Sequence, residues 1–399
     1  MSRLDRPRVA VVGAACADGT SPSVRQDVTL LIDGDRIAGL WFDGSAPDAS
    51  ELGADVIDGS GATIVPAMVD SHAHLSLPGG AHWIDRGFDD PDELLEVGED
   101  NGAAMVRAGI RWARDVGAPR RVGPDGRERA LSLVLRERWQ DAHDRPYVRA
   151  AGTWLSRSGS LPHGLAIELE HAADLTAAVA QQLDEGADLV KLYLDGPDAD
   201  VAPFSVDEVS AAVTLAHGRG ATVAAHSSVL AGARVGAQAG VDSIEHGFAL
   251  DDTIAATLAS NDVTVVSTLA VLHSWQSFRT TSQVERFTST EGIARIAERR
   301  EQAEESIRCA ARAGVAIAAG SDFGGGSLRA NQLAWEVQAL VLAGIEPANA
   351  LAAATWRGGK LVGDETAGRL VVGGPAHFSL VHGDPLVDPS ALWRIWLTR

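Results

Sequence analysis

The sequence predicts an α/β protein: a distorted (β/α)8 TIM barrel that carries a small β-sandwich domain formed from both termini. Three observations support this fold. Residues 65–355 repeat the order strand, loop, helix, with eight strand-like runs. Residues 1–64 and 356–399 instead have short strand-like runs and Gly/Asp turns. The polar residues that could carry chemistry fall at the ends of the predicted barrel strands.

The two terminal segments are expected to form one composite domain beside the barrel. Strands are expected at 9–12, 28–32 and 37–40, and again at 368–372 and 376–382. The Asp-Gly-Asp sequence that follows the second of these strands is typical of a hairpin turn. Because the C-terminal strands have no helical partner, we expect them to complete the N-terminal β unit.

Turn and cap residues define the elements of the barrel. Pro91 precedes the first helix as a first-turn proline, and the stretch from Ser205 to Glu208 has the pattern of a capping box. The long segments 153–170 and 270–289 are expected to be loops, which are often functional at this length. Barrel strands are expected within 62–75 and at 114–117, 147–152, 187–193, 221–226, 241–246, 263–269 and 315–322. Helices are expected at 92–113, 127–140, 172–185, 205–219, 231–239, 251–260, 291–313, 331–343 and 347–355.

The composition argues against several classes of partner. The chain has 34 Lys and Arg residues against 54 Asp and Glu residues, which gives a net charge of −20. Such a surface repels phosphate backbones and anionic lipids, so we expect a small-molecule or peptide substrate, no nucleic acid and no membrane. Cys16 and Cys309 form no metal-spaced or disulfide pattern, and the N-terminal residues lack the apolar run of a signal peptide. We therefore expect a cytoplasmic protein, and the sequence is compatible with a homo-oligomer.

Two histidines mark the end of the first predicted barrel strand. A short apolar run within 62–75 ends in His72 and His74. Residues two apart on a strand point to the same side, so both imidazoles would leave one face of the strand end. Neutral imidazoles suit a borderline-soft divalent ion such as zinc. Taken alone, the pair fits a metal site and two surface histidines equally well.

Four further candidates lie at the ends of later strands. Lys191 lies in the fourth strand, His226 ends the fifth, His246 ends the sixth, and Asp322 follows the eighth. The C-terminal strand ends of such a barrel meet on one rim, where its active sites form. Unrelated polar residues would not be expected to align there, so the alignment predicts one site. The alternatives are a rim lysine paired with an acid and two histidines satisfied within the core.

Taken together, these motifs resemble those of the metal-dependent amidohydrolase superfamily, in particular its imidazolonepropionase-like branch, which includes prolidases. The matching stretches run in the family's order across almost the whole chain. They lie at 64–75, 114–117, 190–193, 225–226, 243–247 and 320–322.

The resemblance implies a binuclear metal centre. The two histidines of the first strand would bind the more buried divalent ion together with Asp322, and the histidines of the fifth and sixth strands would bind the second ion. Lys191, carboxylated by CO2, would bridge both ions, which we expect to be Zn2+. A bridging hydroxide would be the nucleophile, and Asp322 would pass its proton to the leaving nitrogen.

Elementary chemistry is consistent with these implied roles. Lysine is a cation and a poor ligand at neutral pH, whereas its carboxylated form is a bidentate anion that can span two ions. Divalent ions lower the pKa of a bound water from about 15.7 towards about 7. An ion can also polarise the scissile carbonyl, and a carboxylate at the rim can move one proton in both directions.

Three further residues are candidates for substrate binding. His163 lies in the long Gly/Ser/Pro loop, where the resembled branch often has a Gly-Gly-His-Gly turn that helps to hold the substrate carbonyl. That position also makes His163 a candidate catalytic residue. Tyr193 and His273 lie near the predicted rim. Relatives that cleave peptides often place a tyrosine after the strand-five histidine, whereas Ser227 and Ser228 stand here.

The resemblance therefore predicts a metal-dependent hydrolase that cleaves a C–N amide bond of a peptide-like or N-acyl substrate. Two alternatives stay open. One is hydrolysis of a cyclic amide or an amidine, as in a resembling group that trims an amidine-bearing peptide during bottromycin maturation. The other is a mononuclear aminohydrolase, a deaminase, which would not need Lys191 to bridge two ions.

Overall fold

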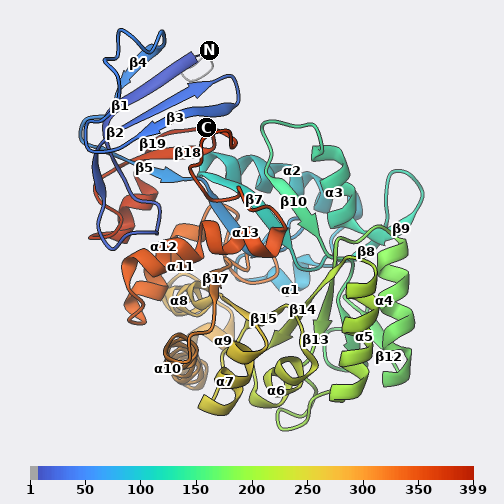
Figure 1. The fold of residues 1–399 in the computed structure, drawn as a ribbon. Helices are drawn as coiled ribbons and strands as arrows, with labels where there is room; N and C mark the ends of the chain where they lie inside the picture. Colours follow the sequence, from blue (N-terminus) through green and yellow to red (C-terminus); the bar gives the residue numbers. More distant parts are fainter. Residues whose placement is uncertain (1–7) are drawn as a thin grey trace.

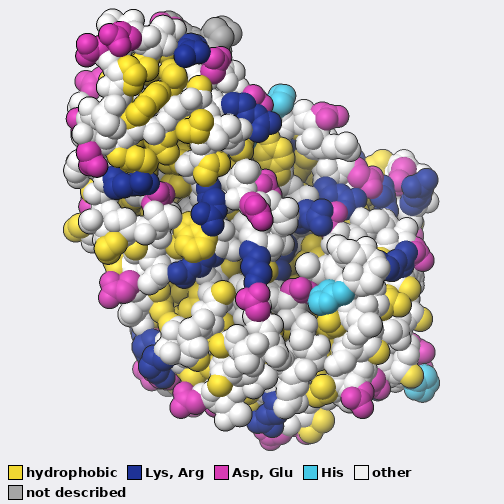
Figure 2. Space-filling model, viewed as in Figure 1, with side chains coloured by type: hydrophobic (Ala, Val, Ile, Leu, Met, Phe, Trp, Pro, Cys, Tyr) yellow, Lys and Arg dark blue, Asp and Glu magenta, His cyan; other side chains and the backbone are white. Residues whose placement is uncertain are grey.

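The computed structural model describes residues 8–399 (Figure 1). The first seven residues, which belong to the predicted terminal domain, lie outside the described part. Across residues 8–399, no helix is both long enough and apolar enough to cross a membrane. The face drawn in Figure 2 intersperses acidic and basic side chains, with apolar side chains between them.

Strands from both ends of the chain form one seven-stranded sheet, at the upper left of Figure 1. Its order is β19-β18-β5-β1-β2-β3, and β4 pairs with β1. The C-terminal β18 runs antiparallel to β5 and so joins the two ends of the chain. The strands predicted to form a β-sandwich are thus hydrogen-bonded as a single sheet within the described residues. The strands are β1 (Arg8–Cys16), β2 (Arg25–Asp33), β3 (Arg36–Trp41), β4 (Asp55–Asp58), β5 (Ala62–Pro66), β18 (Phe378–His382) and β19 (Ile395–Thr398).

Parallel strands form two further sheets below this one, in the orders β10-β7-β6 and β12-β11-β13-β14-β15-β16-β17. Single parallel bridges join them, between Ala151 and Leu189 and between Ala73 and Phe323. These parallel sheets agree with the predicted α/β class. The strands are β6 (Met68–Ala73), β7 (Ile110–Asp115), β10 (Tyr147–Ala150), β11 (Leu155–Arg157), β12 (Ile167–Leu169), β13 (Leu189–Tyr193), β14 (Thr222–Ser227), β15 (Ser243–His246), β16 (Thr264–Ser267) and β17 (Ile317–Ala319).

Helices follow most of these strands and lie outside them (Figure 1). The predicted cap signals are present. Pro91 begins α2 after Asp90, whose side chain accepts from Asp92 N, and Ser205 and Glu208 form a reciprocal capping box at α5. The helices are α1 (Trp83–Arg86), α2 (Pro91–Arg107), α3 (Leu131–Trp139), α4 (Leu175–Asp184), α5 (Val206–Gly218), α6 (Leu230–Ala239), α7 (Asp252–Ser260), α8 (Leu269–Ser277), α9 (Glu285–Thr288), α10 (Thr290–Arg312), α11 (Leu333–Leu342), α12 (Pro347–Ala353) and α13 (Trp356–Val362).

Several predicted boundaries were wrong. The helix expected at 92–113 ends at Arg107, because Gly109 adopts a left-handed conformation (φ 76°) and the fully buried strand β7 begins at Ile110. The helix expected from residue 127 begins at Leu131, because the preceding residues pair in the hairpin of β8 (Arg120–Val122) and β9 (Glu128–Ala130).

Regular structure also occurs where loops were expected, and one expected strand is absent. Segment 270–289 contains most of α8 and all of α9, and segment 153–170 contains the short strands β11 and β12. Residues 368–372 form no strand, whereas β19, which was not predicted, pairs with β18. Such short strands depend on tertiary pairing rather than on local sequence alone.

Candidate metal centre

His72 and His74 lie at the C-terminal end of β6 and converge on one carboxylate. The Nε2 atoms lie 3.4 Å (His72) and 3.2 Å (His74) from Asp322 Oδ1. One ligand atom from each of the three residues fits within a mutual distance of 4.8 Å, and all three residues are buried. The backbone maintains this approach, because Asp322 N donates to His72 O at 2.7 Å.

The second ring nitrogen of each of these histidines faces a protein acceptor. His74 Nδ1 lies 2.7 Å from the carbonyl of Gly117, and His72 Nδ1 lies 2.7 Å from Glu245 Oε2. A carbonyl can only accept, so His74 must donate from Nδ1 and present a bare Nε2 when neutral. Two bare imidazole nitrogens and a carboxylate oxygen then face one another. A cation between them satisfies all three, which fits a divalent metal ion.

Electrostatics favours, in His72 and Asp322, the states that a metal requires. Burial, followed by the positive charge of Lys191, lowers the pKa of His72, which favours the neutral ring. Burial works against ionisation of Asp322, but its electrostatic interaction with His72, followed by the close approach of the His72 and His74 imidazoles, outweighs it and holds the pKa of that carboxyl well below its usual range. These two residues therefore offer a neutral imidazole and a carboxylate.

His226 and His246 lie beside this group, on the neighbouring strands β14 and β15. The ring of His246 is 4.7 Å from that of His72 and 4.5 Å from that of His226, between centroids. His246 Nδ1 lies 2.8 Å from Thr268 Oγ1, and burial, followed by the other histidines, lowers the pKa of His246 well below its usual value. All four histidines therefore adjoin, although His226 and His246 do not belong to the three-residue group.

Asp195 was not predicted to belong to the site. Its Oδ2 lies 3.1 Å from His226 Nε2, and Ser228 donates to it from both its backbone N and its hydroxyl. Burial opposes ionisation of Asp195, but the hydrogen bonds from His226 and Ser228 outweigh it and lower the pKa of Asp195 to about 2. The Tyr193 ring stacks on the other side of His226, with 4.0 Å between centroids. An alternation of polar residues two apart in 193–195 is the only local signal.

Lys191 points from β13 into the same region. Its side chain is only 1% exposed, and its Nζ has no hydrogen-bond partner within residues 8–399. Burial is the main cause that lowers the pKa of Lys191 to about 8. A buried, unpaired ammonium is costly, so this amine is more available in its neutral, nucleophilic form than an ordinary lysine.

A buried ion pair between Arg114 and Glu245 supports His72. Arg114 donates to Glu245, and Glu245 in turn accepts from Ser243 and from His72. Burial opposes ionisation of Glu245, but Arg114 and then Lys191 hold its pKa well below the usual value. The roles of Arg114 and Glu245 were not predicted, although both residues fall within the matching stretches. Asp115 accepts from Leu75 N and Gly117 N, as expected of a structural residue.

Two candidate ligands adopt a backbone conformation that is rare for residues with a side chain. The φ angle is 71° at His246 and 51° at Asp322. Conformations of this kind cluster at functional sites, where the surrounding structure holds them in place.

The six side chains line a hollow of about 270 Å³. Its other walls are mainly apolar and aromatic. They include Leu77, Trp83, Ile84, Trp154, Leu161, Leu165, Phe248, Val271 and Trp275. Polar groups that converge in an apolar hollow are typical of a small-molecule site.

The three predicted substrate residues lie at different distances from this hollow. Tyr193 lines it, whereas His163 and His273 are not among its lining residues. The His163 side chain is 95% exposed and faces Glu168, and the neighbouring loop residues Leu161, Pro162 and Leu165 reach the hollow instead. His273 lies 3.7 Å from Glu304 on α10. Contact of His163 and His273 with substrate therefore stays a prediction.

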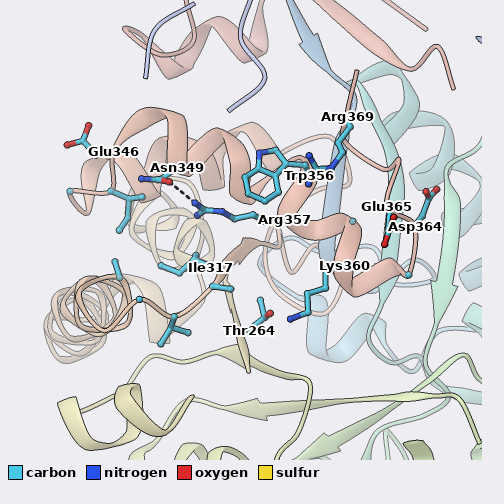
Figure 3. Close-up of a pocket in the computed structure, with 18 residues that line it drawn as sticks. Thr264, Ile317, Glu346, Asn349, Trp356, Arg357, Lys360, Asp364, Glu365 and Arg369 are labelled. Carbon is cyan, nitrogen blue, oxygen red and sulfur yellow. Dashed lines mark hydrogen bonds between the residues drawn. The ribbon is translucent and has the colours of Figure 1, made fainter. Parts of the chain in front are cut away.

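A larger hollow, of about 1080 Å³, lies elsewhere (Figure 3). Thr264 and Ile317, which line it, are the first residues of β16 and β17, so it lies at the opposite strand ends from the metal ligands. Figure 3 shows Arg357 extended towards Asn349, to which it donates at 2.6 Å. No histidine lines this hollow, so volume alone does not identify the site of chemistry.

Comparisons with known proteins agree with the geometry. The model of the Amidohydrolase family matches residues 63–395. An uncharacterized protein of Mycobacterium tuberculosis is 32% identical over 332 residues, which cover 79% of each chain. An imidazolonepropionase of Salinispora tropica is 27% identical over 297 residues, 67% of this chain and 68% of the relative.

A solved structure of a Xaa-Pro dipeptidase with bound methionine has the same fold, with a TM-score of 0.82 at 23% identity over 98% of both chains. These matches confirm the resemblance inferred from the motifs and the TIM-barrel-like α/β fold.

Proposed function

Because the chain belongs to the amidohydrolase family and is a hydrolytic enzyme, we propose that it cleaves an amide C–N bond of a peptide-like or N-acyl substrate at a binuclear metal centre. The observation that carries the proposal is the convergence of His72, His74 and Asp322, three buried electron-pair donors that need a cation between them. Metal-dependent hydrolysis of C–N bonds is the activity that the family supports.

Six residues would hold two divalent ions. The group of three would hold the first ion, and His226 and His246, whose rings adjoin it, the second. Lys191, carboxylated by CO2, would contribute to both sites, which is supported by its buried and unpartnered amine. We propose zinc because imidazole and carboxylate ligands suit it. When bound, the ions would lower the pKa of an attacking water and polarise the substrate carbonyl.

The chain's own groups would position the substrate and move the proton. Asp322 faces the histidines through Oδ1, and no hydrogen bond within residues 8–399 engages its Oδ2. That oxygen can accept the proton of the attacking water and deliver it to the leaving nitrogen. The aromatic walls, among them Trp154, whose ring centroid is 5.3 Å from that of His74, would exclude bulk water and receive an apolar group of the substrate.

A cyclic amide is the second candidate substrate, because the hollow of about 270 Å³ is small enough to favour a compact ligand. We also propose that residues 1–64 and 356–399 form a separate β domain beside the barrel of residues 65–355. The net charge of −20 of the whole chain supports a small-molecule or peptide substrate rather than a nucleic acid or a membrane.

The test is turnover and metal content measured on the same sample. Dipeptides, N-acyl amino acids, lactams and amidines would be incubated with purified protein whose metal is quantified. The proposal predicts about two ions per chain and hydrolysis of an amide. About one ion per chain in fully active protein would favour the mononuclear deaminase. No hydrolysis in any of the four groups would contradict the proposed substrate class.

A further inference from the structure

Arg299, on α10, lines the hollow together with the candidate metal ligands. Its guanidinium carbon lies 5.5 Å from the centroid of the Phe248 ring, and that ring lies 5.3 Å from the ring of His246. A single aromatic side chain thus separates the arginine from the candidate metal centre. A ligand that fills the hollow can touch both.

The guanidinium of Arg299 has neither a hydrogen bond nor an ion pair within residues 8–399, unlike its neighbours on α10. Arg295, one turn earlier, pairs with Glu291 at 2.5 Å, and Arg300 lies 3.2 Å from Glu304. Arg299 is partly buried, and burial lowers its pKa. Taking a cation out of water without a partner is unfavourable, so an anion that enters the hollow would recover that cost.

Within residues 8–399, no acidic side chain forms a hydrogen bond or an ion pair with Arg299. Asp195 is the acidic group that acts on it most strongly, but Asp195 already accepts hydrogen bonds from His226, Ser227 and Ser228. The Tyr193 hydroxyl also lies within the electrostatic reach of Arg299 and has no hydrogen-bond partner in the described residues. The Arg299 guanidinium and the Tyr193 hydroxyl therefore line the hollow as two hydrogen-bond donors without a partner in the described residues. They lie on the side of His226 and His246.

We propose that Arg299, assisted by the Tyr193 hydroxyl, binds a carboxylate of the substrate while the scissile amide lies at the candidate metal centre. A guanidinium binds a carboxylate through two parallel hydrogen bonds, and aromatic walls that exclude water strengthen such a pair. The substrate would then be an N-acyl amino acid or a short peptide with a free carboxylate and an apolar group against Trp83, Trp154 or Trp275. This inference rests on the proposed function.

The first test measures binding rather than turnover. N-acetylphenylalanine and N-acetylphenylalaninamide differ only in the carboxylate, and tryptophan fluorescence reports occupancy because three tryptophans line the hollow. The full chain would be titrated as purified, with its metal quantified, and again after chelation. The native protein is expected to prefer the acid about tenfold or more, as for a charge-assisted bidentate pair.

Substitutions at two positions of α10 distinguish a specific role of Arg299 from a general effect of positive charge on binding of the acid. Arg299→Met is expected to abolish the preference for the acid and leave binding of the amide unchanged. Arg299→Lys keeps the charge but loses the bidentate geometry, so it is expected to retain part of the preference. Arg295→Met, which removes an exposed arginine on the same helix, is the control and is expected to bind like the native protein.

Equal affinity of the native protein for acid and amide would overturn the inference, and so would an undiminished preference in Arg299→Met. The comparison in the native protein decides the matter even if a variant fails to fold. A clear preference for the acid without hydrolysis of any carboxylate-bearing amide by metal-loaded protein would contradict the proposed function and leave the carboxylate site standing. Hydrolysis of an amide by a protein that shows no preference for the acid would support the proposed function and overturn the carboxylate site at Arg299.

Discussion

The two histidine pairs of the site are built differently. His72 and His74 come from one strand end, and together with Asp322 they already lie close enough to share an ion. His226 and His246 come from adjacent strands, and His226 Nε2 faces Asp195 rather than the other ligands. The first pair is therefore preorganised by the backbone, whereas we expect the second pair to depend on Lys191, on Asp195 and on the ion itself.

The largest effect is expected from a substitution in the group that His72, His74 and Asp322 form. Asp322→Asn removes the carboxylate that both Nε2 atoms face and the proposed proton carrier. We expect kcat to fall by about 10²–10⁴-fold, the range for a lost general acid–base group, with weaker metal binding. Steady-state kinetics and metal analysis measure both effects. Native turnover by Asp322→Asn would refute its assigned role.

The next largest effect is expected from the loss of Lys191, the residue proposed to join the two pairs. In Lys191→Ala the proposed shared ligand is absent, so we expect about one ion per chain instead of two and a loss of at least tenfold in turnover. Circular dichroism controls for folding. A Lys191→Ala protein with full metal content and full turnover would contradict the binuclear proposal.

A smaller effect is expected from a substitution that weakens only the hydrogen bond orienting His226 of the second pair. Asp195→Asn keeps the shape but weakens the acceptor that orients His226. Loss of such a supporting hydrogen bond costs about 10–100-fold in metal affinity, so titration should show one weakened ion and one ion of native affinity. Equal weakening of both ions would mean that the two pairs are not separable in the way described here.

The smallest expected effect concerns Glu336, which supports the segment that contacts His246 of the second pair. Glu336 accepts from Ser267 Oγ and Ala270 N, on either side of the Thr268 that contacts His246. Burial raises the pKa of Glu336 to about 8. The folded state then holds a proton that the unfolded state releases above about pH 4.3, so the contribution of Glu336 to stability falls as pH rises from about 4 to about 8.

Urea denaturation across that range, with Glu336→Gln as the comparison, tests this sign. Relative to Glu336→Gln, the native protein is expected to lose free energy of unfolding as pH rises over this range, by an amount on the order of a few kcal/mol at most. A stability difference between the native protein and Glu336→Gln that stays constant, or that grows in favour of the native protein as pH rises, would contradict the assignment.

The residues that the sequence could identify are those with a strand-end position. His72, His74, Lys191, His226, His246 and Asp322 all follow that pattern, so strand period and barrel topology suffice to place them near one another.

Asp195, Arg299 and Glu245 could not be assigned roles in this way, because their neighbours in the site are distant in sequence. Arg299 in particular lies in a highly charged helix, where a solvent-facing role is the default. The boundary between α2 and β7 was predicted wrongly for a related reason. The strand β7 continues the apolar pattern of α2, and the conformation of Gly109 separates the two elements.

The central claim is that six side chains hold two ions at unequally organised sites. Anomalous X-ray scattering from a crystal of the zinc-loaded enzyme tests it most directly. The account predicts two peaks, one within reach of His72, His74 and Asp322 and the other within reach of His226 and His246, with Lys191 carboxylated between them. A single peak, or two peaks away from these residues, would contradict it.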